Sequence, residues 1–359
     1  MKYLISFLMV LVFTKVQAQY PAVTIRGSEV RKITSKIVAG QEYELHIMLP
    51  AGYKAADKKY PVVYLMDSQW DFPLVTGLYG EHYYDGFIPE LIIVGVTWSG
   101  EHANYDSLRI RDYSPTKVDA LPQSGGADQF LAFMKQELFP FIESNYKADN
   151  KNRTLMGCSG GGVFTLYTLF TQPDLFTGYV AATPYIPWDD GVLYKYEQDF
   201  SKKHLPNPVR VYMTVGDVET TRSAFEKFTA NMVAHKNPSV RLHSKILENT
   251  GHGGTKNETY ARGLQYVFER PKLNLAPMVL NRYIGIYQLP DGRTLQLKNE
   301  HGQLMLYFGN QVFTLYAASE LDFYATAQFL NIHFENATGK PPGFWMEMYG
   351  NKQFVKKTN

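Results

Sequence analysis

The run Gly157-Cys158-Ser159-Gly160-Gly161 places a serine among glycines. Residues 153–156 before it are strand-like and residues 162–170 after it are helix-like, as the nucleophile elbow of a serine hydrolase requires. Such a sharp turn presents a serine hydroxyl at the top of a sheet, and small neighbours let a substrate approach. The N–H groups that begin the helix favour an oxyanion. We therefore interpret Ser159 as a nucleophile and the backbone N–H of Gly160 as an oxyanion donor.

Cys158 is the only cysteine of the chain and the alternative nucleophile. A thiol is intrinsically more nucleophilic than a hydroxyl. However, the residue before the serine of such a turn points away from the cleft, so we favour a small buried side chain. One cysteine also excludes an intrachain disulfide and a cysteine-rich zinc site. The sequence predicts no metal site and no cofactor.

The serine requires a histidine base later in the chain, with an acid between them. Of the nine histidines, His252 alone lies in a glycine-containing loop after an expected late strand, residues 241–247. The others precede the serine, lie in strands where we expect packing or surface roles, or lie in polar segments. The turn after the expected strand 208–215 offers Asp217 and Glu219. Either carboxylate could orient the imidazole and stabilise its charged form.

A second oxyanion donor is expected in the loop after an early strand, residues 61–66. The backbone N–H of Ser68 or Gln69 is the candidate. Trp70 follows in the same loop, and Trp188 follows the strand after the helix of the elbow. We predict that these two tryptophans are walls of a substrate site, whereas most of the 26 Tyr and 22 Phe pack the core. Aromatic walls suit sugars, feruloyl groups or catecholate siderophores.

Strand-like and helix-like segments alternate between residues 20 and 270, which indicates an α/β fold with a mostly parallel sheet. Residues 61–66 and 91–97 are continuous apolar runs, typical of strands that are covered on both faces. Residues 127–146 carry apolar side chains at four-residue spacing and predict a helix, which Pro140 should kink or divide. Further strands are expected at residues 42–49, 153–156, 178–183, 208–215 and 241–247.

The sequence pattern changes after residue 270. From residue 283 onward, short alternating strands are separated by turn signals, which predicts a small antiparallel β-barrel or sandwich. We therefore divide the chain into an α/β-hydrolase domain (19–270), a linker (271–281) and an accessory β domain (282–359).

Residues 1–18 have the pattern of a secretory signal peptide: a short positive start, an apolar run and a small-x-small cleavage site before Gln19. The run is too short to span a bilayer, so we expect cleavage, a periplasmic or secreted protein, and no membrane insertion afterwards.

Composition and charge exclude several classes of function. Hydrophobic residues make up 45% of the chain and charged residues 19%, which argues against disorder. The formal charge is +2, and loss of residues 1–18 would remove Lys2 and Lys15 and leave equal numbers of basic and acidic residues. We therefore expect no binding to nucleic acid.

Residues 124–184 resemble the putative esterase family of α/β-hydrolases, which includes siderophore, feruloyl and acetyl-xylan esterases, S-formylglutathione hydrolases and mycolyltransferases. Residues 60–67 and 111–115 match upstream signatures of that family, so the resemblance covers roughly residues 25–270. It implies an α/β-hydrolase fold with Ser159 as nucleophile and His252 as base.

The same resemblance bears on the acid and on the end of the chain. In this family the acid tends to end a Gly-x-x-Glu/Asp pattern, which selects Glu219 over Asp217, although some siderophore-esterase relatives manage with serine and histidine alone. Relatives often carry histidine where this chain has Cys158. Residues 283–357 resemble the small β-barrel found after serine hydrolases and penicillin-binding-protein-like enzymes.

These observations predict an exported serine esterase that acts through an acyl-enzyme on a small-molecule or carbohydrate ester. An acyltransferase would use the same residues, with an alcohol in place of water. A non-catalytic binding protein on a hydrolase fold is the third hypothesis, and the presence of serine, histidine and acid argues against it.

Overall fold

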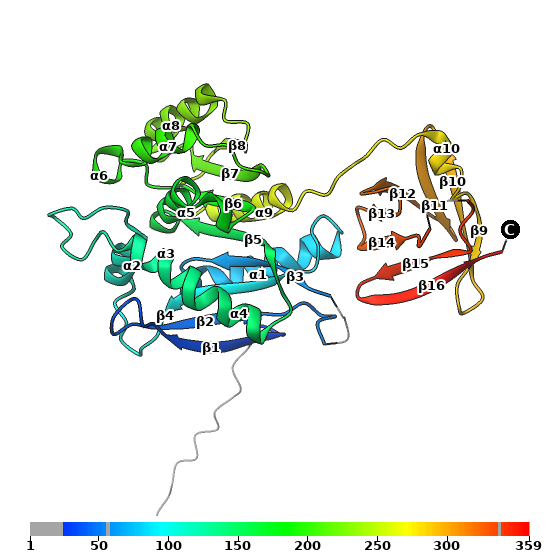
Figure 1. Cartoon of the computed structure of the whole chain (residues 1–359), viewed down its shortest axis with the longest axis horizontal. Coiled ribbons are helices and arrows are strands. Elements are labelled where there is room, and N and C mark those ends of the chain that lie inside the picture. Colours follow the sequence, from blue (N-terminus) through cyan, green and yellow to red (C-terminus); the bar gives the residue numbers. More distant parts are fainter. Residues whose placement is uncertain (1–23, 55–57, 337–338, 359) are drawn as a thin grey trace, which may run out of the picture.

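The computed structural model describes residues 24–54, 58–336 and 339–358. An α/β domain and a closed β-barrel are joined by an extended segment (Figure 1). The α/β-hydrolase class with a second, all-β domain is thus confirmed. The expected signal peptide lies outside the described residues.

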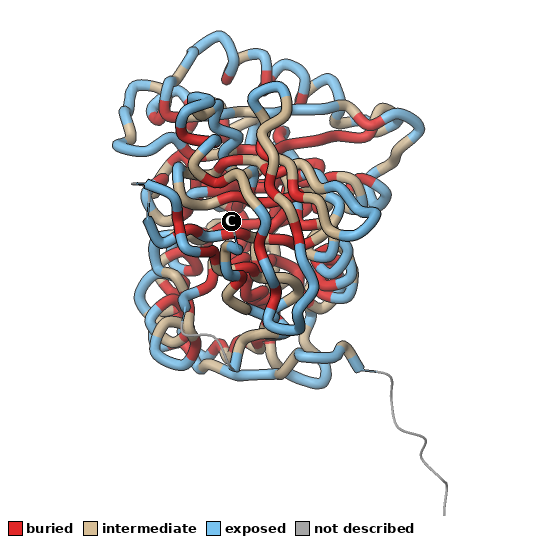
Figure 2. The backbone as a smooth tube through the Cα atoms, turned by 90° about the vertical axis from the view of Figure 1, so that its right-hand side faces the viewer, coloured by how far each residue is buried: buried red, intermediate tan, exposed pale blue. Residues whose placement is uncertain are grey.

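An eight-stranded sheet forms the centre of the α/β domain, in the order β1-β2-β4-β3-β5-β6-β7-β8. The first two strands and β4 pair antiparallel, and all pairs from β4 to β8 are parallel. The strands are β1 (Ser28–Thr34), β2 (Glu42–Met48), β3 (Tyr60–Leu65), β4 (Ile92–Trp98), β5 (Ala148–Cys158), β6 (Gly178–Ala182), β7 (Val209–Gly216) and β8 (Val240–Leu247). Every residue of β4 and β6 is buried, because helices cover both faces of the sheet. Buried segments gather in the interior of the molecule and exposed ones at its periphery (Figure 2).

Two groups of helices cover the sheet. One face carries α1 (Ser68–Tyr84) and α9 (Thr255–Val267), and α5 (Gly160–Thr171) lies on the other with its neighbours. The remaining helices of this domain are α2 (Tyr105–Tyr113), α3 (Ala127–Phe133), α4 (Phe139–Asn145), α6 (Trp188–Gly191), α7 (Leu193–Ser201) and α8 (Arg222–His235). None of the described helices is long and apolar enough to cross a membrane.

The helix predicted over residues 127–146 is divided, as Pro140 led us to expect. It comprises α3, a π-helical turn Met134–Leu138 and α4, with Pro140 in the first turn of α4. Proline lacks an N–H group, so it is tolerated where a helical segment begins.

The β-barrel comprises β9 (Gly285–Gln288), β10 (Thr294–Glu300), β11 (Gln303–Phe308), β12 (Gln311–Ala317), β13 (Asp322–Ala325), β14 (Leu330–His333), β15 (Gly343–Met348) and β16 (Asn351–Lys357), and the short helix α10 (Pro277–Leu280) precedes it. Strand β9 pairs with both β10 and β16, so the sheet closes on itself around its own apolar core. Closure removes the free sheet edges that a small β domain would otherwise expose.

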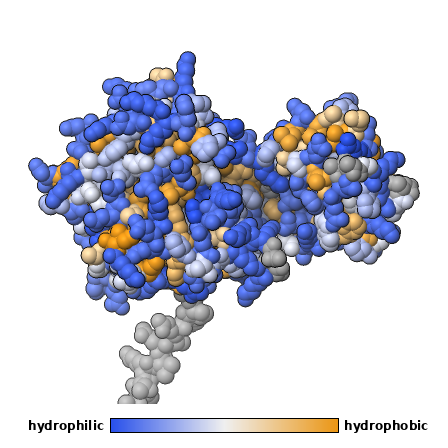
Figure 3. All heavy atoms as spheres, viewed as in Figure 1, coloured by the Kyte–Doolittle hydropathy of each residue, from blue (hydrophilic) through white to orange (hydrophobic). Residues whose placement is uncertain are grey.

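The barrel packs against the end of α1. The Phe329 N–H donates to the Tyr84 carbonyl oxygen at 3.0 Å. The rings of Tyr84 and Tyr349 stack at 5.1 Å, and those of Tyr83 and Phe329 lie 4.5 Å apart. In the space-filling view, hydrophilic residues cover most of the visible face, which narrows between the two domains (Figure 3).

Alanine substitutions at two glycines test how closely α9 packs on the sheet, with an open position on α1 as the control. A Cβ atom at Gly263 of α9 would lie 2.5 Å from Val180 Cγ1 on β6, whereas one at Gly77 of α1 would meet nothing within 4 Å. We expect Gly263→Ala to lower the free energy of unfolding by about 1–3 kcal/mol through overpacking. The control Gly77→Ala should raise it by up to about 1 kcal/mol, because alanine is the better helix former. Chemical denaturation of both variants measures these changes, and an unaltered Gly263→Ala would contradict the close packing.

Candidate active site

Ser159 lies in a strained turn between β5 and α5, with φ 57° and ψ −115°. A Cβ atom at Gly157 would lie 2.5 Å from the carbonyl oxygen of Gly161, so the chain can turn this sharply only with glycine there. The Ser159 N–H donates to the Ala182 carbonyl oxygen at 2.9 Å, which ties the turn to β6. Strain of this kind persists only where surrounding contacts fix it, and it clusters at functional sites. The serine therefore has the conformation of a nucleophile elbow.

Glu219, and not Asp217, contacts the imidazole of His252. Glu219 Oε2 lies 2.8 Å from His252 Nδ1, and its other oxygen accepts the Gly216 N–H at 2.9 Å. The Thr183 hydroxyl also donates to Oε2, at 2.6 Å. Because the Glu219 side chain is only 6% exposed, these bonds fix one orientation of the carboxylate, which then orients the ring.

Asp217 holds the loop that carries the histidine. Its carboxylate accepts the Thr250 N–H at 3.0 Å. The N–H groups of Thr250 and Asn249 lower the pKa of Asp217, because they stabilise its charged form. Asp217 thus joins the turn after β7 to the turn after β8.

Ser159, Thr183, Glu219 and His252 follow four neighbouring strands, β5 to β8, at their carboxyl ends. Parallel strands bring these ends to one edge of the sheet. Among the described residues no hydrogen bond joins Ser159 Oγ to His252, whose side chain is more than half exposed. In free enzymes such catalytic hydrogen bonds are often long and tighten only with substrate.

Arg109 of α2 places a guanidinium group beside the serine. Its Nε and Nη2 atoms donate to the two carboxylate oxygens of Asp67 at 3.1 and 2.7 Å, and Nη2 lies 3.4 Å from the Cys158 carbonyl oxygen. A Cβ atom at Gly160 would lie 3.5 Å from Nη2. Burial opposes the charge of Arg109, but the bonds and charge of Asp67 outweigh it and raise the pKa of Arg109. A cation held by Asp67 therefore lines the same cavity as Ser159.

The sequence did not lead us to Arg109, Asp67 or Thr183. Asp67 belongs to a segment that resembles the family, and Arg109 lies two residues before another, but neither had a role assigned. The only available signal was the position of Asp67 and Thr183 directly after strands that end at the catalytic edge.

The two expected backbone donors begin neighbouring helices. Ser68 and Gly160 are the first residues of α1 and α5, where N–H groups have no partner within the helix. The two helix starts are adjacent, because a Cβ atom at Gly161 would lie 3.3 Å from Asp67 Oδ2. Both dipoles thus favour negative charge near Ser159.

The Ser68 hydroxyl belongs to a second hydrogen-bonded chain. Ser68 Oγ lies 2.8 Å from His46 Nδ1, and His46 Nε2 lies 3.0 Å from Glu44 Oε1. On β4, Gly95 pairs with His46, and a Cβ atom at Gly95 would collide with Ser68 Oγ. Ser68 is only 1% exposed, so its hydroxyl is not available as a nucleophile, and this hydrogen-bonded chain instead fixes the start of α1. His46 therefore does more than the packing or surface role expected of a strand histidine.

Trp188 lines a cavity with Ser159, whereas Trp70 does not. A cavity of about 140 Å³ is lined by Ser159, Arg109 and Trp188, with Tyr113 and Tyr185 among its other walls. Trp70 does not line this cavity, but its ring lies 5.7 Å from the Arg109 guanidinium, and the residue is 48% exposed. The structure thus brings Trp188 to the serine and leaves Trp70 on the adjoining surface.

Cys158 is buried among the residues beneath α1 and α9. Burial raises the pKa of its thiol to about 12, so the thiolate is scarcely populated at neutral pH. Its side chain lies on the opposite face of the sheet from α5, as expected for the residue before the nucleophile.

Comparison with known proteins places this arrangement in a family. Residues 35–262 match the family described as "Putative esterase". The ferri-bacillibactin esterase BesA of Bacillus subtilis is 32% identical over 55% of this chain and 73% of its own length. The siderophore triacetylfusarinine C esterase of Aspergillus fumigatus is 28% identical, over 42% of this chain and 53% of the relative.

A solved structure is similar as well. The BES protein from Bacillus cereus superposes with a TM-score of 0.63 and 26% identity, over 69% of this chain and 97% of that protein. The family match ends at residue 262, before the barrel. The chain belongs to the putative esterase family, and its α/β domain is that of an esterase.

Proposed function

We propose that the protein is an exported serine esterase in which Ser159, His252 and Glu219 form the catalytic triad. The observation that carries this proposal is the 2.8 Å contact between Glu219 and His252, at the edge where the strained Ser159 lies. Family membership supports the ester bond as the target.

In the proposed reaction, Ser159 Oγ attacks the ester carbonyl carbon and His252 accepts the hydroxyl proton. Glu219 stabilises the resulting imidazolium. The guanidinium of Arg109 and the N–H groups of Gly160 and Ser68 stabilise the oxyanion. The tetrahedral intermediate collapses, His252 returns the proton to the leaving alcohol, and an acyl-enzyme forms. Water then attacks this ester by the same route, and the acid is released.

A siderophore ester is the substrate class that we favour. Two relatives are named as esterases of siderophores. The cavity beside Ser159, about 140 Å³, accepts only part of a large substrate. The exposed rings of Trp70 and Tyr185 would then contact the remainder. Feruloyl and acetylated carbohydrate esters are the competing substrates, and an acyltransferase would differ only in the alcohol that enters.

Labelling and a substrate panel test the proposed function. The exported protein should begin at Gln19 and react with a fluorophosphonate probe, and Ser159→Ala should abolish labelling. Wild-type protein should hydrolyse a ferric catecholate trilactone with a higher kcat/KM than p-nitrophenyl acetate, methyl ferulate or acetylated xylan. Absence of labelling in the folded wild type would refute the serine-esterase mechanism, and retention of Met1 would refute export.

Substitutions of Glu219 and Asp217 distinguish the proposed catalytic acid from the acid that only holds the histidine loop. We expect Glu219→Gln to lower kcat by roughly 10²–10⁴-fold, because the imidazole loses its orientation and its counter-charge. Asp217→Asn keeps an oxygen for the Thr250 N–H and should lower kcat by less than about tenfold. The kcat of each folded variant is measured on the same activated ester. A large loss of kcat in Asp217→Asn would show that Asp217 is the essential acid. An unchanged kcat in both variants would indicate a serine–histidine dyad.

Arg109 provides an independent test of the oxyanion site. We expect Arg109→Gln to lower kcat/KM by roughly 10²–10³-fold, as loss of one oxyanion donor does in other hydrolases. Arg109→Lys should restore little of the lost kcat/KM, because lysine cannot form the paired hydrogen bonds to Asp67. The matched control is Arg222→Gln on α8, which removes only an exposed pair with Glu226. Equal kinetics of the Arg109 and Arg222 variants would exclude a role for the guanidinium.

A further inference from the structure

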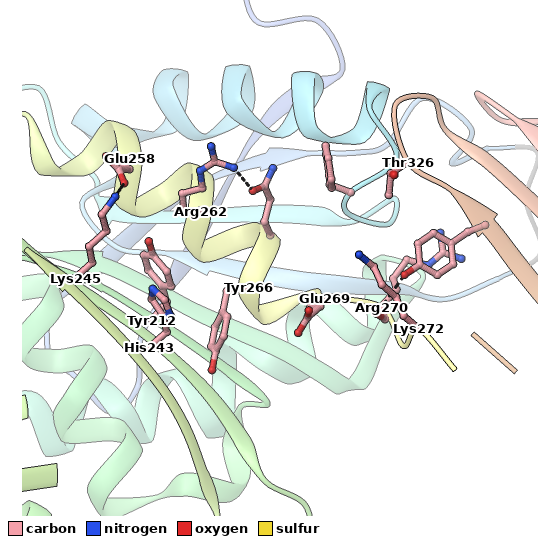
Figure 4. A pocket seen from close by; sticks show the side chains of 13 residues that line it. Tyr212, His243, Lys245, Glu258, Arg262, Tyr266, Glu269, Arg270, Lys272 and Thr326 are labelled. Atoms are coloured by element: carbon pink, nitrogen blue, oxygen red, sulfur yellow. Dashed lines mark hydrogen bonds and ion pairs between the residues drawn. The ribbon is translucent and has the colours of Figure 1, made fainter. Parts of the chain in front are cut away.

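A groove of about 540 Å³ lies where the α/β domain meets the linker and the barrel. Its walls come from β7, β8 and α9, from Glu269, Arg270 and Lys272, and from Tyr324 and Thr326 of the barrel (Figure 4). This volume is within the range of small-molecule sites.

The groove is separate from the proposed catalytic site. Helix α9 begins at Thr255, just after His252, and the groove runs along it from Glu258 to Tyr266. At 1.5 Å per residue, the Tyr266 end of the groove lies about 16 Å along the helix from Thr255. Neither Ser159 nor His252 lines the groove.

Arg270 supplies a half-buried positive charge without a close counter-ion. Among the residues that the structure describes, no carboxylate lies within ion-pair distance of its guanidinium, which donates to Asn331 Oδ1 at 2.8 Å and lies 3.8 Å from the Tyr324 ring centroid. Burial lowers the pKa of Arg270 to about 10, even though the more distant Asp322 and Glu347 favour its charge. Most of its N–H donors have no acceptor among the described residues, so an anion would be stabilised there.

Two further cations add to this charge. Arg262 donates to the neutral Gln265, and Lys272 lies over the ring of Tyr316. Within the described chain, neither forms an ion pair with a carboxylate. Of the two acids in the groove, Glu258 is neutralised by Lys245, which leaves Glu269 against three cations.

Flat rings lie between the cations. His243 and Tyr212 stack in parallel, with centroids 5.1 Å apart and 4° between their planes. The Tyr266 ring lies 5.6 Å from His243, and its hydroxyl donates to the Arg241 carbonyl oxygen. Figure 4 shows these rings between Lys245 at one end of the groove and Arg270 at the other. His243 is exposed and Tyr266 half-buried, so their outer faces are available to a ligand.

We propose that this groove binds an acidic oligosaccharide. A carboxylate of the ligand pairs with Arg270 and Lys272, and a sugar ring packs on Tyr266 and His243. Cations spread along an extended groove fit a ligand in which ring and carboxylate repeat, and they fit a single-ring acid less well. Such binding has two contributions. The ion pairs weaken as the salt concentration rises, whereas the ring contacts do not depend on salt.

Isothermal titration of the full mature chain tests the proposal, with trigalacturonate as probe. We expect trigalacturonate to bind at least about tenfold more tightly than neutral xylotriose, because bonds to a charged group are worth roughly 10–100-fold in affinity. Trigalacturonate should likewise bind more tightly than ferulate, which is a single-ring acid. Arg270→Gln should weaken binding of trigalacturonate by at least about tenfold, and Lys272→Gln by a smaller factor. The control Arg293→Gln, in an exposed pair with Asp291, should leave binding unchanged.

The outcomes are distinct from those of the esterase tests. Arg270→Gln should retain wild-type hydrolysis of p-nitrophenyl acetate, which also shows that it is folded; if it does not fold, Lys272→Gln and Arg262→Gln take its place. No binding of trigalacturonate, equal binding of xylotriose, preference for ferulate, or cation variants that bind as wild type would each overturn the proposal. Because binding is measured directly, an inactive Ser159 would not affect the result.

Discussion

The conformation of Ser159 is the constraint around which the α/β domain is arranged. A non-glycine residue at φ 57° is unfavourable, and it persists here because both sides of the turn are closely packed. Gly161 fits against Met66 at the end of β3, where a Cβ atom would lie 3.2 Å from the methionine Cβ. The two adjacent strands β3 and β5 thus bring their following helices, α1 and α5, to the same point. The convergence of two helix starts at one serine follows from this packing.

Two buried carboxylates, one turn apart at the start of α1, hold the rest of the site to that point. Asp67 binds Arg109 of α2, and Asp71 accepts bonds from Lys256 and Tyr260 of α9, both at 2.6 Å. Helix α9 directly follows the His252 loop, so α1 connects Arg109, beside the serine, to the segment that carries His252. Buried ion pairs add little net stability, because desolvation offsets the attraction, but loss of one partner is costly. Their effect here is on geometry, since each fixes an element whose position the chemistry requires.

The sequence was most informative where one local pattern determined the structure. Continuous apolar runs predicted β3 and β4, and Pro140 predicted the division of the helix over residues 127–146, which the structure shows. Chain order and loop position indicated His252 and narrowed the acid to two residues, and the structure places Glu219 on the imidazole. The role of Arg109 could not be predicted from the sequence, because α2 is a short, polar helix and Arg109 acts through its contact with Asp67, 42 residues earlier. The contact of Ser68 with His46 likewise depends on the register that sets His46 opposite Gly95, which no local pattern encodes.

The same helix that organises the site also determines what the barrel can do. Helix α1 has 17 residues and therefore a length of about 25 Å. Its first residue, Ser68, lies beside the elbow, while Tyr83 and Tyr84 at its last turn contact the barrel. The barrel thus contacts the end of α1 that lies away from Ser159. What it does complete is the groove at Arg270, because Tyr324 of β13 lies against the guanidinium. The proposed chemistry at one end of α1 and the proposed binding between the domains at the other are therefore separable by experiment.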